Sequence, residues 1–474
     1  MIDNQLTLPN GKIITLNDQQ TEGLGKILEW LKSDKMFFTL AGVAGSGKST
    51  ISKKIIELCN IYESDICISA PTHKAVKVVS RMSEIQGKTM HTILGLRPDV
   101  QLENFLPNFP EFAPIAPPKI GNYKLIFIDE ASMINSELFK FLKKLNRGFK
   151  VKILFMGDPC QIPPVGEAQS VVFSDPEIEI FWLTKVIRQK GSNPLMPIYD
   201  AIRSNLDDYY GGFERITNIN EKGEGVLFTS SKGEFRNLII EEFSSDKAKN
   251  DIEYVKLIAW TNDSVMKSNY LIRNIIYGEN PDIVELNENL MGYRTISDAT
   301  MKFNIIENSG DYRVIKKSTL EENMYGILGY RLTLREKIDE TYNNDTDVFL
   351  IDNSDHVNLH RYAGMHDMFR DQAVKNKKLW RKYYEFRRKN MILVDIDQFE
   401  NGAKRGKKDY IKKDICYGYS ITGHKSQGST YNRVFLLLNN IYESSNINER
   451  NRITYVALSR PTTIAFVLYD LIPL

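Results

Sequence analysis

Short apolar runs alternate with amphipathic stretches along the chain, a pattern typical of buried parallel strands that are connected by helices. The pattern restarts after Asn193, which indicates a second unit of the same kind. The sequence therefore predicts an α/β fold with two α/β domains. The apolar runs that fit buried strands occupy residues 36–40, 66–70, 125–128, 151–156, 255–260, 433–437 and 464–469.

Two stretches depart from this pattern. One is rich in proline and aromatic residues, which interrupt long helices, and we expect it to be a small excursion from the first domain. The other alternates valine, isoleucine and tyrosine with polar residues and favours a β-rich insert in the second domain. The expected parts are a first domain (1–94 and 121–190), the excursion (95–120), a second domain (191–285 and 412–474) and the insert (286–411).

A basic helix is predicted over residues 372–389 of the insert. Its eight lysines and arginines are interleaved with Trp380, Tyr383, Tyr384 and Phe386. Basic groups suit phosphate contacts, and aromatic rings suit stacking on bases. A solvated helix whose aromatic stripe packs on the strands of the insert explains the pattern equally well.

The bulk composition is that of an ordinary globular protein. The 474 residues are 42% hydrophobic and 26% charged, and the net charge of +2 does not by itself indicate nucleic acid as a partner. The four cysteines lack metal-ligand spacing, which favours free thiols in a reducing compartment. We expect no signal peptide and no membrane span, and hence a cytoplasmic protein.

The chemistry of the chain centres on the stretch GVAGSGKST at residues 42–50. It follows an apolar run and precedes a helical pattern, which is the context of a phosphate-binding P-loop. Glycines allow backbone N–H groups to approach phosphate oxygens, and the helix start adds further donors. Lys48 can reach the β- and γ-phosphates of a nucleotide, and Ser49 can bind Mg²⁺.

Acidic and amide side chains follow two of the other apolar runs. Asp129 and Glu130 come directly after the run 125–128, where Asp129 would hold Mg²⁺ and Glu130 would deprotonate the attacking water. Gln161 follows the run 151–156 and can hydrogen-bond a γ-phosphate or its water. Gln20, upstream of the P-loop, offers a donor and an acceptor to an adenine edge, although a solvated helix residue is equally compatible.

Two arginines are candidates for contact with the γ-phosphate. Arg188 is a candidate arginine finger, with a surface salt bridge as the alternative. Arg460 lies at a predicted helix end before a strand, and it could equally cap that helix. Polar turns such as Pro71-Thr72-His73 follow apolar runs, at the edge where open α/β sheets bind ligands.

Taken together and in order, five stretches resemble superfamily 1 helicases of the RecD- and Dda-like branch. The resemblance spans nearly the whole chain. The stretches are the P-loop at 42–50, Asp129-Glu130-Ala131-Ser132, Gly157-Asp158-Pro159-Cys160-Gln161, His424-Lys425-Ser426-Gln427-Gly428 and Tyr455-Val456-Ala457-Leu458-Ser459-Arg460.

The resemblance implies two RecA-like domains with ATP and Mg²⁺ in the cleft between them. It identifies the excursion as a small domain with a strand-separating pin, for which Phe105 and Phe109 are candidates, and the β-rich insert as an SH3-like domain. The implied catalytic residues are Lys48, Asp129, Glu130, Gln161, Arg188 and Arg460. The implied nucleotide-binding residues are Gln20, Gly42, Ala44, Gly45, Ser46, Gly47, Lys48, Ser49, Thr50, Gln427 and Gly428, with Mg²⁺ on Ser49 and Asp129.

The same resemblance implies a motor that moves 5′ to 3′ on single-stranded DNA and opens duplexes at single-strand/double-strand junctions. A monomer is expected, in a viral replication or recombination setting, with single-strand-binding or replication proteins as further candidate partners. The residues expected to face the nucleic acid are Pro71, Thr72, His73, Thr89, His91, Thr261, Asn262, Thr422, His424 and Lys425.

Three other functions stay open at this point. A translocase that displaces bound proteins without efficient unwinding would carry the same motor residues. An RNA-directed helicase is a further alternative, since no residue here distinguishes a 2′-hydroxyl. An ATP-gated binding module with a silent motor belongs to another class, but Glu130 and the two arginines argue against it.

Overall fold

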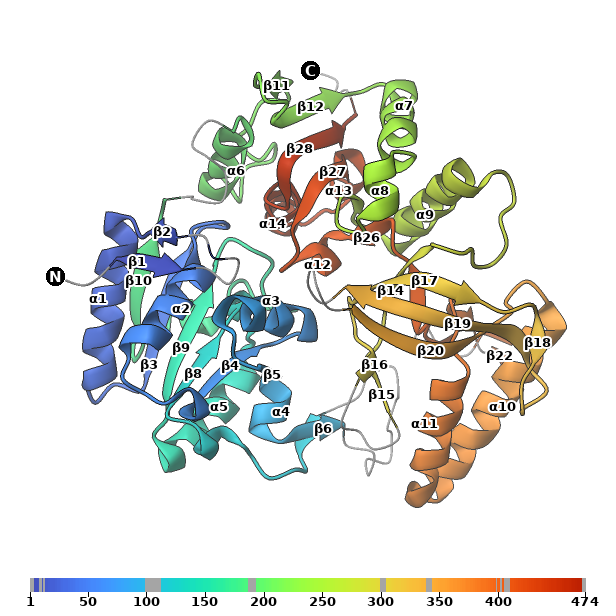
Figure 1. Cartoon of the computed structure of the whole chain (residues 1–474), viewed down its shortest axis with the longest axis horizontal. Coiled ribbons are helices and arrows are strands. Elements are labelled where there is room, and N and C mark those ends of the chain that lie inside the picture. Colours follow the sequence, from blue (N-terminus) through green and yellow to red (C-terminus); the bar gives the residue numbers. More distant parts are fainter. Residues whose placement is uncertain are drawn as a thin grey trace.

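The structure is a computed structural model of the chain (Figure 1). Two α/β units lie side by side, and an antiparallel sheet with a helical hairpin extends from the second (Figure 1). The structure describes residues 4–7, 11, 13–98, 112–185, 193–298, 304–337, 343–397, 399–400, 403–404 and 410–470.

The first sheet has six parallel strands within the described residues. Phe38 and Phe127 face one side of it and Phe37 and Ile126 the other, so both faces are buried, as uniformly apolar strands require. The order is β10 (Glu179–Leu183), β3 (Phe37–Gly42), β9 (Lys152–Gly157), β8 (Leu125–Ile128), β4 (Ile66–Ala70) and β5 (Lys88–Thr89). The flanking helices are α1 (Asp18–Lys32), α2 (Lys48–Leu58) and α3 (His73–Ser83) on one face, and α4 (Met90–Leu94) and α5 (Ser136–Phe149) on the other.

The second sheet is parallel except for its edge strand β11. One of its faces is turned toward the first unit and carries α6 and α14, and the other carries α7 and α9. The order is β11 (Asn218–Ile219), β12 (Gly225–Thr229), β28 (Pro461–Leu468), β27 (Tyr431–Leu437), β13 (Val255–Ala259) and β26 (Ser420–Thr422). The helices are α6 (Leu195–Ser204), α7 (Lys232–Phe243), α8 (Asp246–Asn250), α9 (Asn262–Tyr277), α12 (Gly423–Ser426), α13 (Leu438–Ile441) and α14 (Ile447–Leu458).

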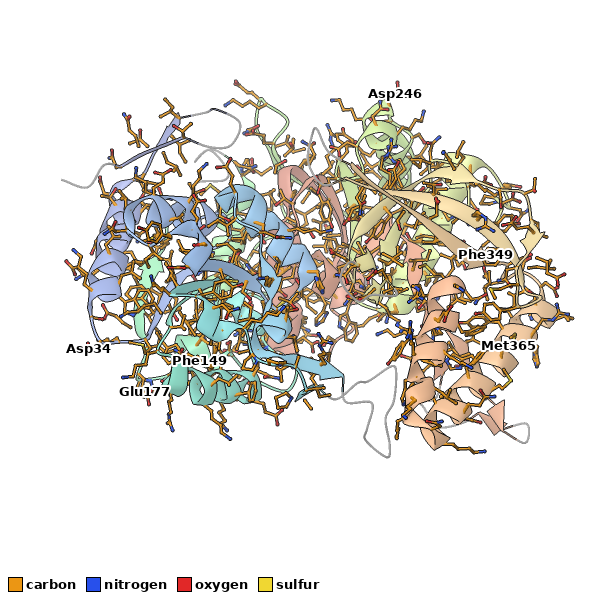
Figure 2. All side chains as sticks on the ribbon, turned by 60° about the horizontal axis from the view of Figure 1, so that its bottom comes forward. Asp34, Phe149, Glu177, Asp246, Phe349 and Met365 are labelled. Atoms are coloured by element: carbon orange, nitrogen blue, oxygen red, sulfur yellow. The ribbon has the colours of Figure 1, made fainter. Side chains whose placement is uncertain are left out.

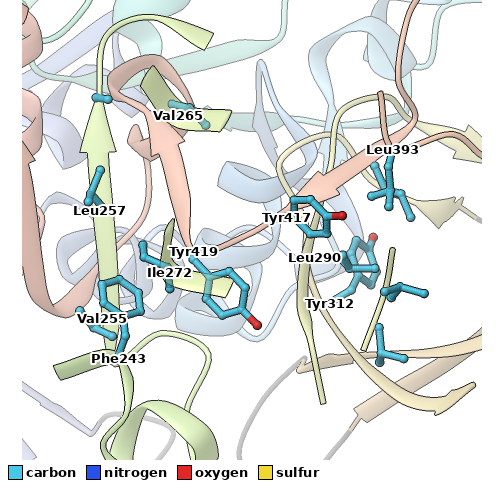
Figure 3. Close-up of a cluster of buried hydrophobic side chains, with 14 of the residues drawn as sticks. Phe243, Val255, Leu257, Val265, Ile272, Leu290, Tyr312, Leu393, Tyr417 and Tyr419 are labelled. Carbon is cyan, nitrogen blue, oxygen red and sulfur yellow. The ribbon is translucent and has the colours of Figure 1, made fainter. Parts of the chain in front are cut away.

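The insert sheet is antiparallel and lies between α9 and β26 in the sequence. Its core is continuous with one face of the second sheet, because Leu290 and Tyr312 pack in the same cluster as Val255 and Ile272 (Figure 3). The strands are β18 (Glu321–Glu322), β19 (Leu328–Lys337), β17 (Asp311–Lys317), β14 (Asn289–Gly292) and β25 (Ile415–Tyr417), with β20 (Asn343–Ile351) beside β19.

The prediction of a single basic helix over residues 372–389 is wrong in its extent. The structure has α10 (His356–Lys375) and α11 (Trp380–Lys389), which pack as a hairpin against β20. The helix α10 ends at Asn376, whose side chain accepts a hydrogen bond from the backbone N–H of Lys378. Phe349 of β20 and Met365 of α10 mark this part of the molecule (Figure 2).

The aromatic residues of α11 are core residues. Trp380, Tyr383 and Phe386 are at most 3% exposed and pack against α10, so they are not available to stack on bases. The alternative of an aromatic stripe packed on the strands of the insert holds for Phe386, which lies against β20, whereas Trp380 and Tyr383 are buried against α10. The basic residues Lys375, Lys378 and Arg381 remain on the surface of the hairpin.

Short pairs of strands complete the described chain. In the proline-rich excursion, β6 (Leu96–Pro98) pairs antiparallel with β7 (Phe112–Pro114), and the pin candidates Phe105 and Phe109 lie outside the described residues. The other pairs are β1 (Gln5–Thr7) with β2 (Ile13–Thr15), β15 (Ile296–Ser297) with β16 (Asn304–Ile306), β21 (Ile396–Asp397) with β24 (Tyr410–Ile411), and β22 (Phe399–Glu400) with β23 (Ala403–Lys404). In the described part of the chain no helix has the length and apolar character to cross a membrane.

Candidate nucleotide site and nucleic-acid interface

The P-loop joins β3 to α2 at the carboxyl edge of the first sheet. Gly45 and Gly47 have φ angles of +78° and +81°, a left-handed conformation that glycine adopts without steric cost. Side chains cap the starts of α1, α3, α4 and α5, whereas among the described residues no side chain caps α2. The start of α2 therefore offers its backbone donors to an anion held by the loop.

Lys48 and Ser46 lie within this loop. The Nζ atom of Lys48 donates hydrogen bonds to the carbonyl oxygens of Gly42 and Val43, at 2.8 and 3.0 Å. The Ser46 hydroxyl is buried and has no hydrogen-bond partner within the described structure. A buried hydroxyl beside an uncapped helix start fits a site that phosphate oxygens complete.

Gln20 connects α1 to the P-loop. Its Oε1 accepts a hydrogen bond from the backbone N–H of Asn17, which completes a capping box, and its Nε2 donates to the carbonyl oxygen of Ser46 at 3.3 Å. The side chain is 3% exposed, so the solvated-residue alternative is wrong. The structure gives Gln20 a role in holding the loop, and adenine recognition by its amide remains a prediction.

The acidic pair follows β8 at the same edge of the sheet. Asp129 is buried, and its backbone N–H donates to the carbonyl oxygen of Ser69 at 2.9 Å. Glu130 has a φ of +50°, an uncommon conformation for a residue with a side chain. Such a strained backbone persists only where the surrounding structure holds it in place, and it is a feature typical of functional sites.

Gln161 lies in the loop after β9. Its side chain is 5% exposed, and its Oε1 has no hydrogen-bond partner among the described residues. The backbone N–H of Gln161 donates to the carbonyl oxygen of Asp158 at 3.1 Å, which fixes the turn. A buried amide with an open acceptor can orient a water molecule or a phosphate group.

The opposite wall of the site comes from the second unit. Nε2 of Gln427 donates to the hydroxyl of Ser132 at 3.1 Å. Gly428, with φ of +75°, approaches so closely that a Cβ there would lie 3.5 Å from Oε1 of Glu130. These contacts bring the segment after α12 directly against the acidic pair of the first unit.

Arg460 lies on the same wall, just after α14. It is 3% exposed, and its guanidinium donates to the carbonyl oxygens of Val456 and Ser429 at 2.9 and 3.1 Å. Burial lowers the pKa of Arg460, and the negative charge of Glu130 opposes this shift. Arg460 thus caps the end of α14, as one alternative predicted, and also lies within electrostatic reach of the acidic pair.

The structure adds a group of residues that sequence reasoning missed as site residues: Tyr455, Asp158, Arg203 and Arg452. The Tyr455 hydroxyl accepts hydrogen bonds from the backbone N–H of Ala44 and from Arg203 and donates to Asp158. Arg452 donates to the carbonyl oxygen of Gln161 at 2.9 Å. Tyr455 and Asp158 belong to two of the five stretches that carry the family resemblance, but the sequence gives no signal that the two side chains are in contact.

The polar turns predicted to face nucleic acid share one structural role. Thr72, Thr89, Thr261 and Thr422 each accept a hydrogen bond from a backbone N–H and cap the helix that follows a strand. The longer of these helices, α3 and α9, start at the carboxyl ends of β4 and β13. Helix starts favour anions, so these turns are suited to contact phosphates.

The neighbouring histidines and lysine meet other parts of the chain. His73 lies 3.4 Å from the Asn304 side chain of the insert, and the His91 ring lies 4.6 Å from that of Phe112. Burial lowers the pKa of both histidines, which favours their neutral forms. Nζ of Lys425 donates to the Asn308 side chain at 2.9 Å and lies over the Tyr293 ring.

Comparisons with known proteins connect this geometry to a family. The AAA domain family matches residues 15–217. The ATP-dependent DNA helicase Dda of Enterobacteria phage T4 is 28% identical over 273 residues, which are 57% of this chain and 59% of Dda. A protein of Acanthamoeba polyphaga mimivirus is 26% identical over 505 residues, covering 94% of this chain and 98% of that protein. The crystal structure of Bacteroides Pif1 bound to ssDNA has a similar fold, with a TM-score of 0.51 at 17% identity, covering 96% of this chain and 92% of that one.

The sequence matches support a superfamily 1B helicase of the Pif1-, Dda- and RecD-like group. The expected α/β fold with two RecA-like domains is confirmed. The residues of the P-loop fit ATP, since the uncapped start of α2 and the unpartnered Ser46 hydroxyl offer donors that suit phosphate oxygens. No group of three or more histidine, cysteine or acidic side chains that could hold a metal occurs among the described residues. Mg²⁺ that is shared with phosphates needs only one or two protein ligands, and Ser49 and Asp129 are the residues that would supply them.

The two helicase arginines differ in what the structure says of them. Arg460 lies on the wall that faces Glu130. Arg188 lies outside the described residues, between β10 and α6, so its assignment rests on the sequence motif alone.

Proposed function

We propose that this superfamily 1B helicase hydrolyses ATP to move 5′ to 3′ along single-stranded DNA and to unwind duplexes ahead of it. The observation that carries the proposal is a nucleotide site shared between two sheets. The P-loop, Glu130 and Gln161 come from the first unit, and Gln427, Gly428 and Arg460 from the second. A ligand that contacts both walls can change how the units sit on one another.

The residues of the site have complementary roles in the proposed hydrolysis. Lys48 and the N–H groups at the start of α2 neutralise phosphate charge, and Glu130 accepts a proton from the attacking water. Mg²⁺, held by Ser49 and Asp129, would stabilise the charge that develops on the phosphate oxygens. Arg460 adds positive charge from the second unit, and Arg188 is proposed to do the same.

The coupling to movement follows from contacts that differ between the two nucleotide states. Arg460 and Gln427 reach the site from the second unit, so the loss of the γ-phosphate removes an attraction between the two walls. The turns at Thr72 and Thr422 belong to different units and are proposed to hold successive phosphates of one strand. A cycle of closing and opening would then move the strand stepwise.

The named relatives support DNA as the substrate. Dda of phage T4 is an ATP-dependent DNA helicase, and the Bacteroides Pif1 structure contains ssDNA. The phage and mimivirus relatives support a viral replication or recombination setting in the cytoplasm of an infected cell. A monomer that acts at junctions, with single-strand-binding or replication proteins as partners, completes the proposal.

The proposal also assigns parts of the chain to domains. Residues 1–94 and 121–190 form the first RecA-like domain, and 191–285 and 412–474 form the second. The hairpin of β6 and β7 within 95–120 is proposed to carry the pin, and the proposed SH3-like domain, 286–411, contains all strands of the antiparallel sheet except β25.

Unwinding of partial duplexes tests the function directly. Duplexes with a 5′ tail, a 3′ tail or no tail, made of DNA or RNA, are incubated with ATP and Mg²⁺. We expect opening of the 5′-tailed DNA only. Opening of the 3′-tailed duplex would mean that the motor moves 3′ to 5′, and opening of the RNA duplex would mean that RNA is a substrate.

A second assay separates the remaining alternatives. If no duplex opens while single strands still stimulate ATP hydrolysis, the chain is a translocase that displaces proteins. If single strands do not stimulate hydrolysis, both motor functions are wrong and an ATP-gated binding module remains.

A further inference from the structure

A buried hydrogen-bonded group joins the two units behind the nucleotide site. It consists of Tyr455 on α14, Asp158 after β9, Arg203 on α6 and the backbone N–H of Ala44 in the P-loop. Tyr455 and Asp158 are both fully buried, at 0% exposed. The group thus links four segments of the chain, of which the two at Ala44 and Tyr455 lie 411 positions apart.

The hydrogen bonds of this group are mutually satisfied. The Tyr455 hydroxyl accepts from the N–H of Ala44 at 3.1 Å and from Nη1 of Arg203 at 2.9 Å, and it donates its proton to Oδ2 of Asp158. Nη1 of Arg203 also contacts Oδ2 of Asp158 at 3.0 Å, and Oδ1 of Asp158 accepts from the backbone N–H of Cys160. Burial and the adjacent Asp158 raise the pKa of Tyr455, so the hydroxyl keeps the proton that it donates.

The group is connected to the residues that face the γ-phosphate. Tyr455 lies in the last turn of α14, and the guanidinium of Arg460 donates to the carbonyl oxygen of Val456 in the same turn. Arg203 lies on α6, which packs against α14. Asp158 begins the turn that carries Gln161. These contacts form a continuous path from the P-loop at Ala44 to the helix that holds Arg460.

We propose that the Tyr455 hydroxyl is a positioning group that couples the conformation of the P-loop to the placement of Arg460. Through its bond to Ala44, filling of the P-loop sets the position of α14, and Arg460 then reaches the transferred phosphate. Tyr455 itself does not contact the reacting atoms. The inference rests on the proposed ATP hydrolysis.

Tyr455→Phe tests the role of the hydroxyl, because it removes one oxygen and keeps the buried ring. We expect kcat for ATP hydrolysis at saturating single-stranded DNA to fall at least about tenfold, while KM for ATP changes less than about threefold. We expect a larger effect on kcat than on KM because the P-loop still binds the phosphates, whereas Arg460 is no longer aligned. Nucleotide binding without DNA should stay within about twofold of the wild type.

Tyr362→Phe is the matched control. Tyr362 is also fully buried, and its hydroxyl has no hydrogen-bond partner among the described residues. It lies on α10 in the insert, away from the nucleotide site, so its loss should leave kcat unchanged. Thermal unfolding of both variants shows whether stability differs between them.

Two outcomes overturn the inference. One is an unchanged kcat in Tyr455→Phe. The other is a lower unfolding temperature with a normal kcat per folded molecule, which would make the hydroxyl purely structural. Failure of the proposed function is a separate result, because it would show as wild-type protein without strand-stimulated hydrolysis.

A double variant tests whether the group acts as one unit. Asp158→Asn removes the carboxylate that accepts the hydroxyl proton. We expect Tyr455→Phe with Asp158→Asn to lose no more kcat than the more impaired single variant. Multiplied losses in the double variant would mean that the two residues act independently, and would contradict the coupling.

Discussion

Single residues of the nucleotide site take their positions from backbone geometry. Gly45 and Gly47 turn the P-loop in the left-handed region, and Glu130 is held at a positive φ after β8. Lys48 is the first residue of α2, and its ammonium donates to the carbonyl oxygens of Gly42 and Val43 in the same loop. This arrangement concentrates positive charge where phosphates are expected, and Lys48 supplies the only full charge that the P-loop sequence itself contains.

Lys48→Ala is expected to lower ATP turnover at least about 100-fold, because a charged group that stabilises the transferred phosphoryl is lost. Binding of a single strand should remain measurable, since the proposed strand contacts lie elsewhere. Steady-state hydrolysis and strand binding measure the two effects. Lys53→Ala is the control, because Lys53 lies on the same helix but pairs with Glu84 at 2.7 Å. Retained turnover in Lys48→Ala would mean that the nucleotide site is misplaced.

At the scale of elements, the hairpin of α10 and α11 shows how an aromatic stripe becomes core. Its two helices are joined by a hydrogen bond between Nε2 of His366 and the Tyr383 hydroxyl, at 3.0 Å. Burial lowers the pKa of His366 to about 4, while Asp367 opposes the shift. The imidazole is therefore neutral in the folded hairpin over the range in which an exposed histidine becomes charged.

The stability of the hairpin is expected to fall as the pH drops from about 6.5 toward 4. In this window the unfolded chain binds a proton at His366 and the folded hairpin does not, so protonation favours unfolding. The expected loss between pH 7 and pH 5 is about 2 kcal/mol, from about 1.4 kcal/mol per pKa unit. Denaturant unfolding at the two pH values measures it.

Two variants isolate this effect. His366→Gln cannot be protonated and should show a flatter pH dependence than the wild type. His360→Gln is the control, because His360 lies exposed on the same helix and should keep the wild-type dependence. If the free energy of unfolding changes equally with pH in the wild type and in His366→Gln, other groups cause the pH dependence.

At the scale of the whole molecule, the insert contacts the first unit beside the proposed strand path. Nζ of Lys77 on α3 lies 2.8 Å from Glu307 and 2.6 Å from Glu336 of the insert. His73, one turn earlier on α3, contacts Asn304 of the same insert. The insert thus contacts α3, the helix whose start is proposed to bind the DNA strand.

Lys77→Met is expected to speed the dissociation of a bound oligonucleotide severalfold, because it removes the ion pairs that hold the insert over α3. ATP turnover at saturating DNA should stay within about twofold, since the nucleotide site is unchanged. Stopped-flow release of a labelled strand gives the rate, and its excess over the wild type should shrink at high salt, where ion pairs are screened.

Lys143→Met is a matched control for this experiment. Lys143 also contacts two carboxylates, Asp175 and Glu177, but these pairs lie within the first unit. Its removal should leave strand release unchanged. Equal acceleration in both variants would point to a general loss of stability rather than to the contact between α3 and the insert.

The sequence by itself determined the local elements and the chemistry at their ends. Uniformly apolar runs predict strands that are buried on both faces, and the turns after them carry their functional residues within a few positions. For this reason the P-loop, the acidic pair after β8 and the polar turns at Thr72 and Thr422 could be located without a structure, whereas the role of these threonines as helix caps came from the structure. The order of the motifs then indicated the family.

Tertiary structure decided what meets across the molecule. The bond between Tyr455 and Ala44, the contacts of Lys77 with the insert and the burial of Trp380 join segments whose separation in sequence leaves no periodic signal. The sequence of a basic helix with an aromatic stripe also does not show whether the stripe is solvated or packed, because that depends on whether a neighbouring helix covers it. Local preferences fix each element, whereas the shape complementarity of the packed elements determines which side chains become partners.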